Sequence, residues 1–334
     1  ILSQLAAAYE ILPAAEKIFF ADGTKVYLVL FQNNMELRPT GGFIGSYGLL
    51  TISSGKIADF KIEDVYTADG QLKGHVDPPP AIRKYLSQPH YFLRDSNFDP
   101  DFATSAALSS WFLQKELGKD VDGVIGLNLT LAQKLMKVVG PIKLSDFGNE
   151  EVSDANFFYK VNYFSQDNFF PGSTQKKDIL TAITNEIMIK LTGNGQVNVG
   201  QLLPIIKQSL EEKNILFYFK DEALQKFVED HGWAGRMGKV QCVVMKNEFG
   251  KQSESNTNSC LPDYLSIIEA NLGVNKANYF INKSTVIEKK ITADGQISTT
   301  VTLSYENLNN TSLNQPQTYV NYLRFFVPVG SKLV

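Results

Sequence analysis

The sequence has few of the residues that most metal and redox sites use. It holds only two cysteines, Cys242 and Cys260, and three histidines among 334 residues, and neither cysteine lies in a CxxC motif. A zinc site built from Cys and His is therefore not expected. The segment between the two cysteines is polar and loop-like. They either close it as a disulfide in an oxidising compartment or are two unrelated buried thiols.

A surplus of charge and a long apolar run are also missing. The net charge is −3 and the sequence pI is about 5.8, so the basic surface that nucleic-acid binding requires is not expected. No eighteen consecutive residues are apolar, and no signal-peptide pattern is present. The chain begins at Ile1 inside a helical pattern. We therefore expect preceding residues, with room for a membrane anchor.

The common catalytic motifs are absent. The sequence contains no Walker A loop, no GxGxxG, no GxSxG and no HExxH. The nearest approach to a nucleophile elbow, "GFIGSYG", lacks the required glycine spacing and leads into a strand pattern. Any chemistry must therefore come from other polar clusters.

The first two thirds of the chain alternate between strand and helix patterns. The apolar run 25–32 predicts a buried central strand, and a turn at Ser54-Gly55 predicts a hairpin between 44–53 and 56–66. Helix patterns flank an apolar strand, which favours an α/β layer with parallel strands. The further predicted elements are helices at 102–118, 130–140, 151–164, 174–191 and 199–212, and strands at 121–128, 215–220 and 240–245.

The character of the sequence changes at both ends. Residues 2–20 have helical spacing, with Pro13 expected to kink or split the helix. After residue 276 the chain reads as long alternating strands, with a turn at 293–295. Three strands are few for a stable sandwich, so we expect another segment or chain to complete this module. The predicted division is an N-terminal helix (1–21), an α/β domain (22–275) and a β module (277–334), with strands at 277–291, 297–308 and 318–330.

The most polar cluster follows the first central strand. Ligands usually bind at the carboxyl ends of such strands, and glycines there let the backbone approach closely. Arg38 can grip a phosphate or a carboxylate, and the amides suit sugar hydroxyls. Alternatively, the amides satisfy the backbone of the turn itself. The cluster comprises Gln32, Asn33, Asn34, Glu36, Arg38, Thr40, Gly41 and Gly42.

Three further clusters carry charge. In "YFLRDSNFDPDF" (91–102), Asp95 and Asp99 could hold Mg²⁺ with Arg94 facing an anion, or the acids could cap the following helix, with Asp101 or Thr104 as the cap. The stretch 61–70 carries Glu63, Asp64 and Asp69 at a strand end. Lys176 and Lys177 lie at a predicted helix start, where they could bind phosphate or form a solvated first turn.

The stretch "YLVLFQNNMELRPTGGFIGSYGLLTISSGKI" resembles the signature of an uncharacterised bacterial envelope family, a domain of unknown function. The blocks "NFFPGSTQKKDIL", "DYLSIIEANLGVNKANYFINK" and "YVNYLRFFVPVGSKL" are similar to the same family. The resemblance implies a bacterial protein outside the cytoplasm, tethered by an upstream transmembrane helix.

A fainter resemblance reaches the LytR-CpsA-Psr phosphotransferases, which move glycans from polyprenyl-diphosphate carriers to the cell wall with Mg²⁺. The block "FATSAALSSWFLQKELGKDVDGVIGLNLTLAQKLMKVVGPIKL" is similar in layout to these enzymes. The resemblance implies a mixed-sheet α/β/α sandwich. In this chain we expect an Ig-like β module after it. Asp64 matches an aspartate of their motif. Where these enzymes carry arginines, this sequence has Glu63, Lys176 and Lys177. Where they carry a metal-binding aspartate, it has Gly45.

Two functions therefore remain open. We expect an extracytoplasmic envelope protein that handles a glycan or lipid-linked glycan, with a non-catalytic binding or surface role favoured and self-association through the β module. The alternative is a LytR-like phosphotransferase with Mg²⁺. Convergence of Arg38, Arg94 and Asp64 on one cleft would favour the enzyme, and a buried Arg38 paired with Glu36 would favour the scaffold. The candidate residues are Arg38, Arg94 and Asp64 for catalysis; Asn33, Asn34, Glu36, Lys176 and Lys177 for ligand binding; and Asp95 and Asp99 for the metal.

Overall fold

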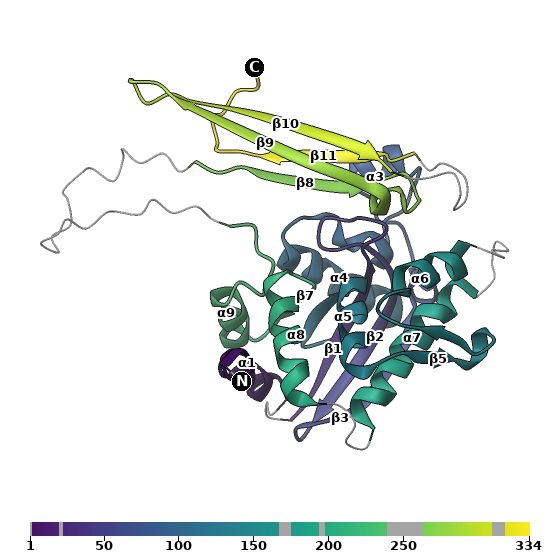
Figure 1. The fold of residues 1–334 in the computed structure, drawn as a ribbon. Coiled ribbons are helices and arrows are strands. Elements are labelled where there is room, and N and C mark those ends of the chain that lie inside the picture. The colour runs from purple at the N-terminus through teal and green to yellow at the C-terminus, as the bar shows by residue number, and fades with distance from the viewer. Residues whose placement is uncertain (1, 20–22, 167–174, 194–197, 239–262, 309–317) are drawn as a thin grey trace, which may run out of the picture.

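The computed structural model shows a mixed α/β protein with further small antiparallel sheets, and green and yellow strands lie across one end of the α/β part (Figure 1). None of its helices, within the residues described, has the length and hydropathy that crossing a bilayer requires. The structure describes residues 2–19, 23–166, 175–193, 198–238, 263–308 and 318–334.

A mixed five-stranded sheet forms the centre of the described α/β part. Its order is β3-β2-β1-β4-β7; β1 is parallel to β4, while the other neighbours are antiparallel. The expected mixed sheet and the expected hairpin of β2 and β3 are confirmed, whereas the expectation of parallel strands is wrong for β1–β2 and β4–β7. Short links from β1 to β2 and from β2 to β3 permit only antiparallel pairing, because a parallel neighbour needs a long crossover. The strands are β1 (Thr24–Asn33), β2 (Phe43–Ser53), β3 (Lys56–Asp64), β4 (Gly123–Asn128) and β7 (Ile215–Phe219).

Local signals explain the best-predicted elements. Ser54 and Gly55 have φ values of 50° and 76°, which match the two-residue hairpin turn that the sequence predicted between β2 and β3. Helix α4 (Phe102–Leu117) begins at Asp101, whose side chain accepts from the Thr104 amide, and ends at Gly118 with a φ of 67°. The hairpin and both ends of this helix are confirmed.

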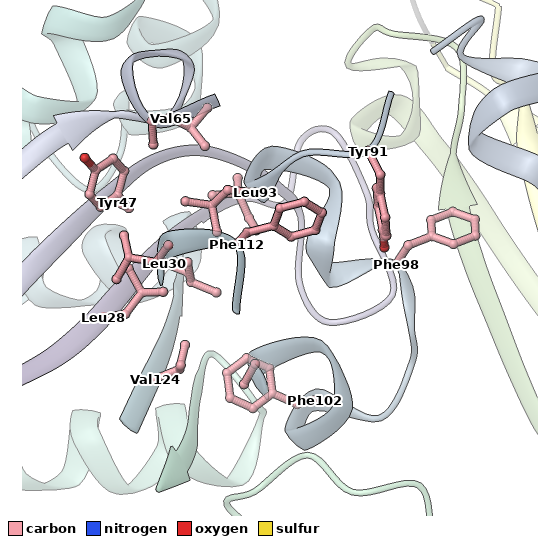
Figure 2. Close-up of a cluster of buried hydrophobic side chains, with 14 of the residues drawn as sticks. Leu28, Leu30, Tyr47, Val65, Tyr91, Leu93, Phe98, Phe102, Phe112 and Val124 are labelled. Atoms are coloured by element: carbon pink, nitrogen blue, oxygen red, sulfur yellow. The ribbon is translucent and has the colours of Figure 1, made fainter. Parts of the chain in front are cut away.

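Helices cover both faces of the sheet. On one face, Leu28, Leu30 and Val124 pack with aromatic side chains of α4, including Phe102 and Phe112 (Figure 2). On the other face, the neighbouring Tyr27 packs in a cluster that includes Ile18 of α1 and Leu210 of α8. Adjacent residues of β1 therefore serve opposite faces. The remaining helices are α1 (Leu2–Phe19), α2 (Val65–Asp69), α3 (Pro80–Tyr85), α5 (Leu129–Val139), α6 (Phe157–Gln166), α7 (Gln175–Thr192), α8 (Val199–Glu211) and α9 (Glu222–Asp230), with 3₁₀ turns at Leu93–Phe98 (η1), Ser145–Phe147 (η2) and Ala277–Phe280 (η4).

Some boundaries differ from expectation. Helix α1 runs through Pro13 without being split, and its packing against α8 supplies stability that local propensity lacks. Helix α6 starts six residues later than predicted (157 against 151), because β6 (Glu150–Val152) pairs with β5 (Ile142–Leu144). Helix α9 was not predicted. The predicted strand 240–245 lies outside the described residues.

The C-terminal β module contains one more strand than the sequence suggested. Strand β8 (Ser266–Asn271) pairs with β11 (Asn321–Phe326), although β8 lies before the expected boundary at residue 276. Strands β9 (Ile281–Ile291) and β10 (Ile297–Asn307) form a hairpin around the predicted turn, where Gly295 has a φ of 81°. The carboxylate of Glu269 on β8 joins the two sheets by accepting from Lys283 on β9 and Tyr305 on β10.

Candidate functional site

The polar cluster after β1 folds into a buried hydrogen-bond network. Gln32 is 2% exposed, and its Oε1 accepts from the Thr40 hydroxyl (2.9 Å) and from Asn97 Nδ2 (2.8 Å). Asn97 also donates to the carbonyl of Gly42 at 2.7 Å. These bonds hold the two ends of the loop between β1 and β2 together, and they link it to η1.

Asn33 and Asn34 take part in the same local structure. Asn33 Oδ1 accepts from the amide of Met35 at 3.0 Å, and Asn34 Nδ2 donates to the Thr130 hydroxyl at the start of α5 at 2.8 Å. This is the alternative in which amides satisfy a turn and its neighbours. Glycine is required at position 42, because a Cβ there would lie 2.1 Å from the carbonyl carbon of Asn33.

The tip of this loop holds the β module. The amide of Leu37 donates to Asn278 Oδ1 (3.0 Å), and its carbonyl accepts from the amide of Asn271 (2.9 Å). Asn278 Nδ2 donates back to the carbonyl of Asn34 at 3.1 Å. The loop thus continues the backbone pairing of the module at the end of β8. We call this set of contacts the joint.

Arg38 is the charged member of the joint. Arg38 is only 4% exposed. One terminal nitrogen of its guanidinium donates to the carbonyls of Asn271 (2.6 Å) and Leu37 (3.1 Å). Burial lowers the pKa of Arg38, whereas Asp95 and Glu36 raise it. Arg38 is therefore buried as the scaffold alternative requires, but it holds a backbone carbonyl of the β module.

Aromatic contacts reinforce the joint. The Tyr322 ring of β11 stacks on Phe98 of η1, with ring centroids 5.7 Å apart, and lies 6.0 Å from the Tyr85 ring of α3. Arg324 lies over the Phe98 ring and donates to its carbonyl at 3.0 Å. The module is thus fixed by apolar packing as well as by hydrogen bonds.

Arg94 organises a second charged cluster beside Arg38. It donates to Asp69 Oδ2 (2.7 Å) and to Gln88 Oε1 (3.0 Å), and its Nε lies 3.5 Å from Asp95 Oδ2. Its guanidinium lies over the rings of Tyr66 and Phe92, at 5.2 and 4.5 Å from their centroids. Arg94 therefore lies between two buried acids, Asp69 and Asp95, and two aromatic rings, Tyr66 and Phe92.

The acids of this cluster have raised pKa values. Burial raises the pKa of Asp69 to about 6, although Arg94 opposes the shift. Burial, followed by the nearby Asp69, raises the pKa of Glu116 on α4 to about 8. Burial also raises the pKa of Asp95, against Arg38 and Arg94. At neutral pH, protonation of Glu116 reduces the negative charge that the two guanidinium groups must balance.

Several buried polar atoms of the described clusters have no hydrogen-bond partner, among them Arg38 Nε, Asp69 Oδ1 and Glu116 Oε2. A buried polar atom that lacks a partner costs about 1–3 kcal/mol. Chemically, the raised pKa of Asp69, about 6, suits a group that exchanges a proton near neutral pH. Stable ion-pair networks also perturb pKa values in this way, so the shifts alone do not define a catalyst.

The other predicted site residues lie outside these clusters or have structural roles. The Asp64 carboxylate accepts from the Tyr66 amide at 2.8 Å and caps α2, while Asp99 is exposed and accepts from the Asp101 amide. Among the residues that the structure describes, no three His, Cys, Asp or Glu are grouped as metal ligands. Lys176 and Lys177 lie in the first turn of α7, with side chains outside the described part, and Cys242 and Cys260 lie outside the described residues.

Sequence reasoning missed several residues of these clusters, among them Glu116, Asn271 and Asn278. Glu116 is 5% exposed and follows Ser109, Phe112 and Leu113 on the buried face of α4, so helical spacing could have placed it inside. Asn271 and Asn278 gave no such signal, because their partners lie more than 200 residues earlier in the chain.

A family model matches part of the chain. Residues 22–163 match the model of a family described as "Protein of unknown function (DUF4012)". The expected resemblance to an uncharacterised family is confirmed over these residues. No curated protein sequence matches the chain.

Solved structures share only a distant likeness. The Lin1025 protein of Listeria innocua matches with 12% identity and a TM-score of 0.33, over 70% of this chain and 91% of that chain. The gbs0355 protein of Streptococcus agalactiae matches with 12% identity and a TM-score of 0.40, over 66% and 75%. The yvhJ protein of Bacillus subtilis, described as a transcriptional regulator, matches with 9% identity and a TM-score of 0.34, over 62% and 77%.

Proposed function

We propose that the chain is a non-catalytic protein of the bacterial cell envelope, outside the cytoplasm and tethered by an upstream helix, that binds a glycan or a lipid-linked glycan. The location and the ligand class rest on the sequence resemblance. In this proposal the α/β part has the LytR-CpsA-Psr architecture, and the β module is Ig-like, with Glu269 linking its two sheets.

One observation carries the non-catalytic part of the proposal. The residues that the sequence offered for ligand binding at the end of β1 are used inside the protein. Arg38 donates to Asn271, and Asn34 donates to Thr130. An arginine that is 4% exposed and bonded to two carbonyls is poorly placed to grip a phosphate from solvent.

The contact surface that we propose for the glycan surrounds Tyr66. This residue is 49% exposed, and its ring lies beside the guanidinium of Arg94, which is held by Gln88. An exposed aromatic ring next to the amide of Gln88 offers a sugar both an apolar face and a hydrogen-bonding group.

Cosedimentation with insoluble cell-wall glycan tests this surface. We expect the intact chain to sediment with the glycan, and Tyr66→Ala to lower the bound fraction severalfold. The control is Tyr9→Ala, because Tyr9 is 85% exposed on α1 and takes no part in the proposed surface. Equal binding by the two variants, or no binding by the intact chain, would refute the proposal.

The phosphotransferase remains a second candidate because of the acidic cluster. Asp69 has a pKa of about 6 beside Arg94, which suits a group that accepts a proton near neutral pH. The proposed Mg²⁺ ligands do not fit one ion, since Asp95 is buried beside Arg94 while Asp99 is exposed on the Asp101 amide. Release of polyprenyl monophosphate, as the glycan and one phosphate pass from the polyprenyl-diphosphate carrier to an acceptor hydroxyl, would establish this candidate if it is lost in Asp69→Asn, and it would refute the non-catalytic proposal.

We also propose that the chain self-associates through the β module, because one face of the β9–β10 hairpin carries exposed apolar side chains. Ile291 and Ile297 are paired and 71% and 45% exposed, and Ile287 on the same face is 49% exposed. Exposed apolar patches mark interfaces. Sedimentation velocity should show a dimer that Ile287→Lys dissociates. Val286→Lys, on the opposite face, should leave it intact. A monomeric intact chain would refute self-association.

A further inference from the structure

Two of the three histidines, fifteen residues apart in sequence, face each other in space. The Nδ1 atoms of His75 and His90 are 2.7 Å apart, and the two rings are nearly perpendicular at 83°. They close the segment that carries α3, together with a backbone hydrogen bond from Tyr91 to Val76 (2.8 Å). Both histidines are exposed, so solvent reaches the nitrogens that meet.

The partners of His75 fix its tautomer. Its Nε2 lies 3.0 Å from Asp77 Oδ1, and Arg83 also pairs with Asp77. A carboxylate that pairs with an arginine at neutral pH has no proton to donate, so Asp77 Oδ1 only accepts. His75 Nε2 must therefore carry the proton. In neutral His75 the Nδ1 lone pair then points at His90, and His90 Nδ1 donates to it.

This arrangement is the one that metal-binding histidines use. A ligating imidazole presents one nitrogen as a lone pair and donates its other N–H to a carboxylate, which orients the ring. His75 with Asp77 has both features, with Arg83 holding the carboxylate in turn. His90 can change tautomer, so that its Nε2 carries the ring proton in place of its Nδ1. The Nδ1 of His90 then presents a second lone pair to a metal ion.

We propose that His75 and His90 bind a late divalent transition-metal ion such as Zn²⁺ through their Nδ1 atoms, with water completing the coordination. Imidazole favours such ions over Mg²⁺. Zn–N bonds of about 2.0–2.1 Å place two nitrogens of a tetrahedral ion about 3.3 Å apart, so the rings must separate by about 0.6 Å. Exposed side chains can move this far. The metal replaces the proton that now lies between the two nitrogens.

The metal would also stiffen the contact between α3 and the β module. The segment that the histidines close carries Tyr85, whose ring lies 6.0 Å from Tyr322 of β11. Crosslinking its ends through a metal stabilises the folded state, because a ligand that binds only that state shifts the unfolding equilibrium. This inference is independent of the proposed glycan binding, and a failure of either leaves the other standing.

Calorimetric titration of the intact chain with Zn²⁺ at pH 7.5, in excess Mg²⁺, tests the site. We expect one Zn²⁺ per chain. His75→Gln and His90→Gln should each weaken binding by at least about tenfold, and Asp77→Ala by about tenfold through loss of the orienting carboxylate. The matched control is His231→Gln, whose Nδ1 contacts the Phe227 carbonyl instead, and it should bind as the intact chain does.

Two further readouts separate a metal site from a structural role. The imidazole nitrogen signals of His75 and His90, and not those of His231, should shift on Zn²⁺ addition. Zn²⁺ should raise the melting temperature of the intact chain but not of His75→Gln. Lowering the pH to 5.5 should weaken binding, because protons compete for the same nitrogens. The proposal would be overturned if the intact chain bound no Zn²⁺ at millimolar concentration, or if both histidine variants bound Zn²⁺ as tightly as the intact chain does.

Discussion

Replacing Arg38 by methionine should destabilise the protein and loosen its β module. Methionine keeps the apolar stem but removes the donors to Asn271 and Leu37. Hydrogen bonds to charged groups are worth about 1.5–3 kcal/mol, and Arg38 also offsets the charge of the buried Asp95. Two effects reduce the loss. The unpartnered Arg38 Nε already carries a penalty, and Asp95 can take up a proton. We therefore expect a net loss of about 2–4 kcal/mol.

Two measurements check this prediction. Urea unfolding, followed by tryptophan fluorescence, gives the free energy of unfolding of the α/β part, which contains Trp111 and Trp233. Amide hydrogen exchange reports the β module separately. The amides of β8 and β11 should exchange faster in the variant, because the module opens more often once the carbonyl of Asn271 loses its donor.

A matched control and a clear contrary result sharpen the test. Arg236→Met removes a half-exposed arginine that pairs with Asp101 at 3.2 Å, and its cost should stay below about 1 kcal/mol. If Arg38→Met changes stability by no more than this control does, and exchange in β8 and β11 is unaltered, then the joint does not depend on Arg38. A large loss of ligand binding with unaltered stability would instead favour the phosphotransferase.

Three more predictions follow from the same contacts. Gly42→Ala should lower stability by about 3 kcal/mol or prevent folding, whereas Gly45→Ala, where a new Cβ meets nothing within 4 Å, should cost far less on thermal unfolding. Burial raises the pKa of Glu116 from 4.5 to about 8, so the folded state binds this proton more tightly than the unfolded chain. Stability should therefore fall as the pH rises through this interval, by roughly 1–2 kcal/mol after solvent screening, and Glu116→Gln should flatten the fall in urea titrations at several pH values. Asn278→Ala should cost about 2 kcal/mol and expose the Leu37 amide to exchange, whereas exposed Asn282→Ala should change neither.

The sequence predicted most of the elements because their signals are local. An apolar run gave β1, two turn residues gave the hairpin at Ser54, and Gly118 gave the end of α4. Partner choice was harder, because strand direction in a sheet depends on loop lengths and on distant segments. Strand β8 was not predicted for that reason, because its partner β11 begins at residue 321, fifty residues after β8 ends at residue 271.

The candidate site was predicted as a group of residues but not as an arrangement. Arg38 and Arg94 lie near the same acid, Asp95, but the sequence left open whether the two arginines converge. The sequence could not show that Arg38 faces a carbonyl of the β module, because no pattern links residue 38 to residue 271. The pairing of His75 with His90 was hidden in the same way, since histidines fifteen residues apart in a loop have no characteristic spacing.

The joint has a consequence for the order in which the chain can fold. The tip of the β1–β2 loop receives its partners from residues 271 and 278, which a ribosome makes about 230 residues later. Until then Leu37 and Arg38 must keep their hydrogen bonds to water, and the surface that the module covers stays open. Contacts of such long sequence separation form slowly, and partly made chains are prone to aggregate. The family-matched segment 22–163 also ends before β7 completes the sheet. It should therefore not fold as an independent domain, and its loop acquires its native shape only when the last strands arrive.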